Sequence, residues 1–112
     1  MIVKTGIDLV DLGEFFQAVQ SGGERFLRKI FLPSELKERK IEHLAGVFAA
    51  KESVIKALGI TAGEWLKLEI KKEPSGRPFL ILDESLKKNL VSFDLSISHT
   101  KDYVVAVFVA LI

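Results

Sequence analysis

The segment from Ile41 to Leu58 carries the most restrictive pattern in the chain. Apolar side chains recur there every three or four positions, at Ile41, Leu44, Ala45, Phe48, Val54, Ile55 and Leu58. This spacing places them on one broad face of an α-helix. Gly59 follows directly and is suited to ending the helix, because glycine readily adopts the left-handed conformation found at many helix C-termini. The sequence therefore predicts one long helix with a wide apolar face.

Alternating or β-branched segments on both sides of this helix predict strands. The first ends near Asp8, and the five segments are Ile2 to Val10, Trp65 to Lys72, Phe79 to Leu82, Val91 to His99 and Tyr103 to Leu111. Pro74-Ser75-Gly76-Arg77 and Thr100-Lys101-Asp102 have turn chemistry, so the last four strands are expected to form two hairpins.

Shorter helices complete the predicted map. Asp11 can cap a helix from Leu12 to Gln20, which Ser21-Gly22-Gly23 stops. A second short helix is expected from Arg25 to Phe31, with Phe26, Leu27 and Ile30 inward, and a third from Leu86 to Leu90. Hairpins and helices together predict one α+β domain over residues 1–112, with helices packed on one face of an antiparallel sheet.

Composition narrows the possible functions. Of the 112 residues 48% are hydrophobic, which suits a single domain, although a chain this short would gain from oligomerisation. The net charge is only +1, so no overall field favours nucleic acid. The chain has no cysteine, which excludes disulfides and a thiol nucleophile, and His43 and His99 alone cannot build a zinc site.

No segment has the pattern of a targeting signal or a membrane span. Met1 to Lys4 leads straight into a predicted strand. The strongly apolar stretch from Tyr103 to Ile112 is too short to cross a bilayer as a helix. We therefore expect a soluble cytoplasmic protein that binds neither membranes nor nucleic acid.

Asp8 and Glu52 are the acidic residues whose positions most suggest a function. Asp8 ends an apolar strand, where a carboxylate is costly unless it is capped or bound. The simpler alternative is that Asp8 or Asp11 caps the next helix. Glu52 shares a helix face with Lys56, four residues later, and the simpler alternative there is an exposed ion pair. Functionally, two carboxylates suffice for magnesium, which takes further ligands from water and phosphate.

Ser96-Ile97-Ser98-His99-Thr100 closes a predicted strand at a turn. The twofold period of a strand puts Ser96 and Ser98 on one face and His99 on the other. Ser98 and His99 therefore diverge and cannot form a nucleophile–base pair, and the chain has no Gly-x-Ser-x-Gly motif. These are either ordinary polar positions beside a turn or, for His99, a contact to an anionic ligand.

Four segments together resemble one known family, the holo-acyl-carrier-protein synthases among the phosphopantetheinyl transferases. In chain order they are Gly6-Ile7-Asp8-Leu9-Val10, Phe48-Ala49-Ala50-Lys51-Glu52-Ser53 with Lys56-Ala57-Leu58-Gly59, Ser75-Gly76-Arg77-Pro78 and Ser96-Ile97-Ser98-His99-Thr100. The likeness covers nearly the whole chain. The motif in the long helix is fairly specific, and the order of all four adds to it.

The resemblance implies the phosphopantetheinyl transferase fold and a homotrimer with sites at its subunit interfaces. It implies an enzyme that moves the 4′-phosphopantetheine group of coenzyme A to a serine of an acyl carrier protein and releases 3′,5′-ADP. Magnesium is the implied cofactor, and fatty acid biosynthesis is the expected setting.

The resemblance also implies roles for particular residues. Asp8 and Glu52 match the magnesium ligands. Lys56 matches a contact to the coenzyme A phosphates, so Glu52 and Lys56 would carry the catalysis. Glu52 is also the candidate for taking the serine proton, directly or through water. Positions near the bound nucleotide match Gly59, Pro78, Ser98 and His99.

The sequence departs from the family pattern in three places. Val47 stands where the family usually has arginine, so a positive contact is lost or comes from another residue. The segment from Gly59 to Gly63 replaces a glycine-rich loop. The first predicted helix is usually basic, but here its start is acidic and apolar, with Asp11, Glu14, Phe15 and Phe16.

The altered first helix affects the expected carrier contact. Basic residues begin only at Arg25, Arg28 and Lys29, so we expect these three to dock an acidic carrier protein, or the carrier to bind weakly. The simpler alternative is a solvated helix face. Two rival functions remain: a trimer that binds coenzyme A or a nucleotide without efficient transfer, and a purely structural oligomer, which leaves the matched polar motifs unexplained.

Overall fold

The predicted long helix is present as α2, Ile41–Leu58, and it forms the centre of the fold. Gly59 ends it in the left-handed conformation, at φ 64°, and its amide donates to the Ile55 carbonyl oxygen. The computed structural model describes residues 1–112. In it α2 is buried on more than one side, since Val47 and Lys51 are as inaccessible as the predicted apolar face.

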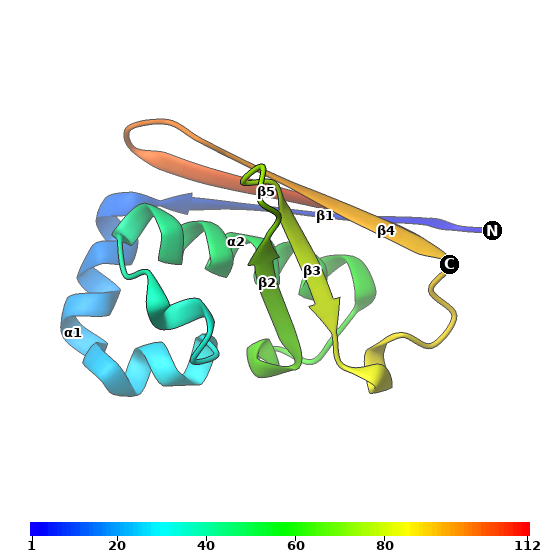
Figure 1. Cartoon of the computed structure of the whole chain (residues 1–112), viewed down its shortest axis with the longest axis horizontal. Helices are drawn as coiled ribbons and strands as arrows, with labels where there is room; N and C mark the ends of the chain where they lie inside the picture. The colour runs from blue at the N-terminus through cyan, green and yellow to red at the C-terminus, as the bar shows by residue number, and fades with distance from the viewer.

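A three-stranded antiparallel sheet lies along α2. Its strands are β1 (Val3–Asp11), β5 (Tyr103–Leu111) and β4 (Ser92–His99), in the order β1-β5-β4. Asp8 therefore lies within β1, opposite Ala106, and does not end the strand as predicted. The two chain ends meet at the sheet, because the Ile2 and Ile112 backbones exchange hydrogen bonds of 2.8 Å (Figure 1).

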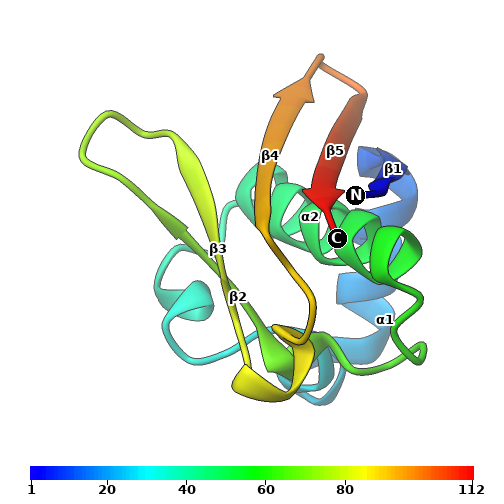
Figure 2. The same ribbon diagram turned by 90° about the vertical axis from the view of Figure 1, so that its right-hand side faces the viewer.

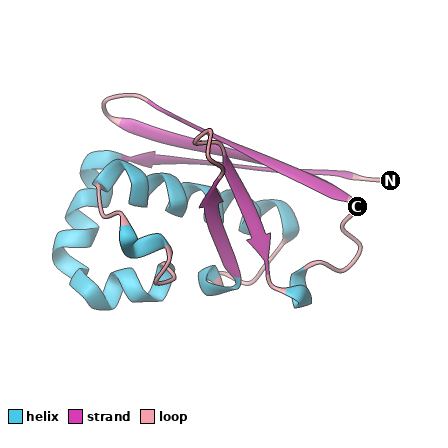
Figure 3. Cartoon of the chain, in the orientation of Figure 1, coloured by secondary structure: helices cyan, strands magenta, loops and turns pink.

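The two faces of this sheet have opposite environments. Side chains that point toward α2 are buried, among them Val10, Leu95, Val104 and Phe108. The other face exposes apolar side chains from β1 and β5: Val3, Ile7, Leu9, Tyr103, Val107 and Val109. Figure 3 shows the helices gathered on the inner side only. The predicted α+β fold with helices on one face of an antiparallel sheet is confirmed, and one sheet face is left apolar and uncovered.

The remaining strands form a separate hairpin of β2 (Leu68–Lys72) and β3 (Pro78–Leu82). The prediction that a strand starts at Trp65 was wrong, because Trp65–Lys67 is a 3-10 turn that leaves Leu66 exposed. Figure 2 shows the hairpin beside β4, flanking α2.

Helix α1, Leu12–Ile30, joins the first two predicted short helices across a kink at Gly23, where φ is 57° and ψ is −151°. The Asp11 side chain caps it by accepting from the Glu14 amide at 3.0 Å, as predicted. A 3-10 turn, Glu35–Lys37, leads from α1 toward α2. The predicted helix from Leu86 to Leu90 is wrong: a 3-10 turn, Glu84–Leu86, stands there. No helix is long and apolar enough to cross a membrane.

Candidate active site

Strand β1 lies against helix α2 at a point of very close approach. A Cβ atom at Gly6 would come within 1.8 Å of the Ser53 carbonyl oxygen, so only glycine lets the two backbones meet here. Asp8 lies two residues along the same face of β1, because strand side chains alternate with period two. The contact at Gly6 therefore brings the Asp8 side chain up against α2.

The Asp8 carboxylate meets Lys56 at this place. Lys56 Nζ donates to Asp8 Oδ1 at 2.9 Å and to the Ile7 carbonyl oxygen at 3.0 Å. The side chain of Asp8 is 15% exposed and that of Lys56 55%, so the ammonium reaches a mostly buried carboxylate from the solvent side. The alternative of an exposed Glu52–Lys56 ion pair is wrong, since Lys56 pairs with Asp8 instead.

Glu52 approaches the same cluster from α2. Burial raises the pKa of its carboxyl above the ordinary value, and the negative charge of Asp8 raises it further. Trp65 and Lys56 act on this pKa in the opposite direction. The Trp65 indole N–H is buried without a hydrogen-bond partner. The charge of Asp8 thus disfavours the ionised form of Glu52, and a cation bound between them would relieve this repulsion.

The donor set of this cluster fits magnesium. Mg²⁺ binds through one or two carboxylates and fills its shell with water and substrate phosphates. Asp8 and Glu52 would supply the carboxylates, and the chain has no group of three or more metal-ligating side chains. The Lys56 ammonium shows that a positive charge is already held beside Asp8. A metal ion here would therefore depend on phosphate and water for the rest of its shell.

A separate cleft of about 340 Å³ lies between the first half of α2, the hairpin and β4. Pro78 and His99 line it, together with Val47. Lys40 and Lys72 bring positive charge to its walls, while Glu38 and Glu42 bring negative charge. The cleft has the size of a small-molecule site.

Ser98 and Gly59 lie outside this cleft. Ser98 stands opposite Val105 on the apolar outer face of the sheet and His99 opposite Val104 on the inner face, so the two lie on opposite faces, as predicted. Ser98 and His99 share a shallow depression of about 290 Å³ with Leu9 and Tyr103. Gly59 ends α2, and a Cβ atom added to it would meet no other atom within 4 Å.

One copy of the chain thus brings the predicted residues together in two groups. Asp8 and Lys56 are bonded, and the pKa of Glu52 responds to both. Pro78 and His99 share the cleft, whose walls include no member of the first group. A ligand that contacts both groups would need either to extend out of the cleft or to reach a second copy.

The sequence pattern of the 4′-phosphopantetheinyl transferase superfamily matches residues 4–108, nearly the whole chain. The chain belongs to this superfamily. The α+β fold and the family expected from the motifs are therefore both confirmed.

Individual relatives of the transferase agree with this assignment. The holo-acyl-carrier-protein synthase of Koribacter versatilis is 36% identical over 119 aligned positions, which cover 95% of both chains. The Helicobacter pylori holo-acyl-carrier-protein synthase, solved in complex with coenzyme A, is 32% identical with a TM-score of 0.88, covering 96% of this chain and 99% of that one. The Bacillus anthracis synthase, solved in complex with CoA (3′,5′-ADP), is 31% identical with a TM-score of 0.82, covering 98% and 96%.

The three basic residues expected to dock a carrier protein lie on the part of α1 that follows the kink at Gly23, here called its second limb. Arg25, Arg28 and Lys29 are all exposed. Arg28 forms an ion pair of 3.4 Å with Glu24, which also pairs with Arg39. Positive charge on this limb is therefore partly neutralised by Glu24.

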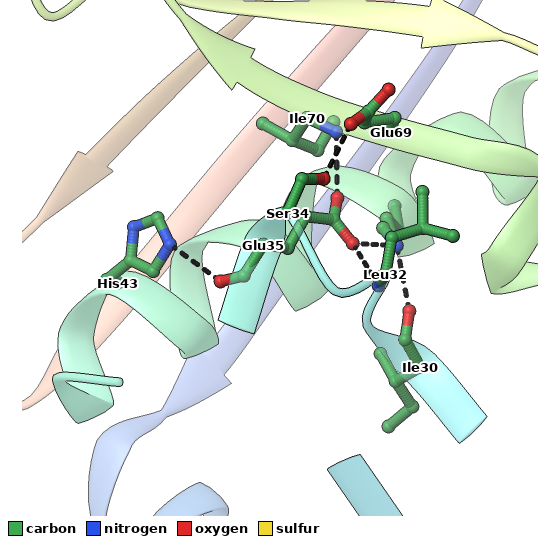
Figure 4. A network of polar contacts seen from close by, with 8 residues as sticks. Ile30, Leu32, Ser34, Glu35, His43, Glu69 and Ile70 are labelled. Carbon is green, nitrogen blue, oxygen red and sulfur yellow. Dashed lines mark hydrogen bonds and ion pairs between the residues drawn. The ribbon is translucent and has the colours of Figure 1, made fainter. Parts of the chain in front are cut away.

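Sequence reasoning missed Lys51 and Glu35, the two charged residues of the core. Their side chains form an ion pair of 2.6 Å and are 0% and 1% exposed. A signal for Lys51 was present, because its neighbours at three and four positions, such as Phe48 and Val54, are apolar. Nothing comparable marks Glu35, whose burial depends on how the segment between the helices folds back (Figure 4).

Proposed function

We propose that the chain transfers the 4′-phosphopantetheine group of coenzyme A to a serine of an acyl carrier protein and releases 3′,5′-ADP. We further propose that Asp8 and Glu52 hold the magnesium ion that this reaction uses. The observation that supports both is the joining of Asp8, Glu52 and Lys56 on β1 and α2, with a cation already bonded to Asp8.

The proposed chemistry is a displacement at phosphorus. The carrier serine oxygen forms a bond to the phosphorus next to pantetheine, and the bond to the 3′,5′-ADP oxygen breaks. When bound, magnesium supplies positive charge that neutralises the phosphate oxygens as negative charge develops on them. Lys56 would exchange its bond to Asp8 for one to phosphate, adding a second positive charge. Glu52, whose pKa is raised by burial, is the proposed acceptor of the serine proton.

The cleft is the proposed site for the nucleotide part of coenzyme A. Pro78 and His99, which the resemblance places near the nucleotide, both line it. Val47 brings no charge to this cleft. Lys40 and Lys72 line it as well and can supply the positive charge that the family's usual arginine would bring. Ser98 and Gly59 are proposed to contact the ligand from outside the cleft.

A homotrimer would combine the two groups of residues. The outer sheet face exposes 61% of Ile7 and 65% of Leu9, and an apolar face of this kind is typical of an interface between protein chains. Ser98 and its depression lie on this same face, so a second copy seated there would adjoin them. We therefore propose that the complete active site forms between neighbouring copies in a closed ring.

The remaining expectations are proposed on the same basis. Arg25, Arg28 and Lys29 are proposed to meet the acidic carrier protein. Because the resemblance implies an acyl carrier protein as the substrate, we propose that the chain acts in the cytoplasm, in fatty acid biosynthesis.

One alternative has an observation in its favour. Glu24 pairs with both Arg28 and Arg39, which weakens the positive charge available to a carrier protein. The alternative is a trimer that binds coenzyme A or a nucleotide without efficient transfer.

Mass spectrometry separates the two functions. The chain is mixed with an apo carrier protein, coenzyme A and Mg²⁺, and the carrier is weighed before and after. The proposal predicts the phosphopantetheine mass increment on the carrier serine. No increment on several carriers, alongside measurable coenzyme A binding, would favour the binding protein.

A further inference from the structure

The carboxylate of Glu35 joins two elements that face each other across the cleft. Its Oε1 atom accepts hydrogen bonds from Lys51 Nζ on α2 at 2.6 Å and from the Leu32 amide at 2.8 Å. Its Oε2 atom accepts one from the Ile70 amide on β2 at 2.8 Å. Figure 4 shows the carboxylate lying between Leu32 and Ile70. One side chain thereby ties α2 to β2.

Lys51 is buried, with two hydrogen-bond acceptors and an aromatic ring beside its ammonium group. Its Nζ donates to Glu35 and, at 2.7 Å, to the Ile30 carbonyl oxygen at the end of α1, and it lies 5.9 Å from the centre of the Phe31 ring. Burial lowers the pKa of Lys51, and the charge of Glu35 opposes that change. Each buried charge therefore depends on the other.

Stability alone does not account for this ion pair. Burying two charges is costly, and apolar side chains of similar volume often equal or exceed a buried ion pair in stability. An apolar side chain could not accept the hydrogen bond that the Ile70 amide donates to Glu35. The hydrogen bonds of the pair are directional, whereas apolar contacts are not. The pair therefore specifies where β2 lies relative to α2.

Both of the tied elements line the cleft. Ile70 on β2 forms one wall, and Val47 and His43 on α2 form another. His43 Nε2 also lies 3.3 Å from the Glu35 carbonyl oxygen, so the same residue contacts the cleft wall twice. The hairpin that Glu35 holds also carries Pro78. A shift of β2 would therefore change the width of the cleft.

We propose that Glu35 and Lys51 are positioning residues that set the separation of α2 and β2 across the cleft, and through it the affinity for the nucleotide part of coenzyme A. This inference rests on the proposed use of the cleft. Neither residue reaches the ligand, since both are enclosed by the core. Their effect is expected in binding rather than in the chemical step.

The test is the double substitution Glu35→Leu with Lys51→Met, which replaces the ion pair by apolar side chains. We expect a folded protein whose Kd for 3′,5′-ADP, measured by calorimetry, rises about tenfold or more because the cleft is displaced. The KM for coenzyme A should rise in parallel, while kcat at saturation changes less than about threefold. The Ile70 amide should exchange its hydrogen faster in NMR.

Phe15→Leu is the control, because Phe15 is a buried residue of α1 outside the cleft. It should lower the Tm without changing the Kd for 3′,5′-ADP. A folded double variant with wild-type Kd and KM would overturn the proposal. If the double variant does not fold, Glu35→Gln replaces it, and unchanged Ile70 exchange and Kd would overturn the proposal equally. Tight 3′,5′-ADP binding without any transfer by the wild-type chain would refute the proposed reaction alone.

Discussion

Lys56 Nζ lies 2.9 Å from Asp8 Oδ1, so an ammonium group stands beside the carboxylate that is proposed to bind a metal ion. The bond joins the middle of β1 to the last turn of α2. If Lys56 turns from Asp8 to phosphate, as proposed, its departure also frees the carboxylate for a cation. Metal and coenzyme A are therefore expected to bind the chain cooperatively.

Lys56→Met tests this coupling. Without the ammonium, Asp8 is free, so we expect Mn²⁺ alone to bind more tightly than to the wild-type chain. Coenzyme A should bind roughly tenfold more weakly, because a charge-assisted contact to phosphate is lost. Electron paramagnetic resonance of free Mn²⁺ measures the first quantity and calorimetry the second.

Lys67→Met is the matched control, since Lys67 pairs only with Glu64 on the surface. It should leave both affinities unchanged. Weaker Mn²⁺ binding by Lys56→Met would show that Lys56 does not compete for the metal position.

Glu52→Gln is expected to stabilise the metal-free chain at neutral pH. The pKa of Glu52 is raised above its ordinary value of 4.5 in the folded state. The protonated side chain therefore contributes its full stability to the fold below pH 4.5, and this stability is lost as the pH rises through the raised pKa. Glutamine mimics the protonated form at every pH. In the presence of a chelator, the variant should therefore have a higher Tm at pH 7, and the difference should vanish near pH 4.

Transfer supplies the second measurement on this variant. Glu52→Gln should lower transfer at least about a hundredfold, since the metal ligand and the proposed base are both lost, while the oligomer stays intact. Glu73→Gln, at an exposed glutamate of the hairpin turn, should change neither Tm nor transfer. Full activity of Glu52→Gln would remove Glu52 from the mechanism.

Periodicity predicts much of this fold because it depends on local spacing. Apolar residues spaced three and four positions apart predicted α2. The two-residue period of a strand placed Ser98 and His99 on opposite faces of β4. The end of β1 was misjudged because strand pairing with β5, which spacing alone does not reveal, extends it to Asp11.

Contacts between distant segments could not be predicted in the same way. Lys56 pairs with Asp8 and not with Glu52, which lies one helical turn away. This follows from the close approach of β1 to α2 at Gly6. The motif order pointed to these residues but carried no geometry. The burial of Glu35 likewise depends on Lys51 and β2, which lie far from it in sequence.

Gly6→Ala should therefore disturb both the fold and the site. The added Cβ would stand 1.8 Å from the Ser53 carbonyl oxygen, so β1 must move away from α2. We expect a loss of about 1–3 kcal/mol in the free energy of unfolding, as for other overpacked sites, measured by urea titration. The Mn²⁺ affinity should fall with it, because Asp8 moves with the strand.

Gly46→Ala, within α2 itself, is the opposite case. The nearest atom to its added Cβ would be 3.6 Å away, an ordinary contact, and alanine favours the helix. This variant should gain about 0.5–1 kcal/mol of stability. A Gly6→Ala protein as stable as the wild type would show that the backbones are not held together at this point.

Arg25→Glu tests the proposed carrier surface. Arg25 is exposed and has no ion-pair partner, unlike Arg28, so reversing its charge acts directly on an acidic carrier. We expect the KM for the carrier to rise about tenfold at low salt, with less effect at high salt, and the KM for coenzyme A to stay constant. Lys88→Glu, on the loop before β4, is the control. An unchanged carrier KM would place the docking surface elsewhere.

Val107→Glu tests whether the outer sheet face holds copies of the chain together. Val107 lies opposite Ile7 on that face, and both are exposed in the single chain. Burying a carboxylate in an apolar interface is costly, so we expect monomers in light scattering and loss of transfer, while circular dichroism stays that of a folded protein. Ile81→Glu, at an exposed apolar residue of the hairpin, should leave the oligomer unchanged. An intact, active Val107→Glu oligomer would mean that the active site does not depend on contacts across this face.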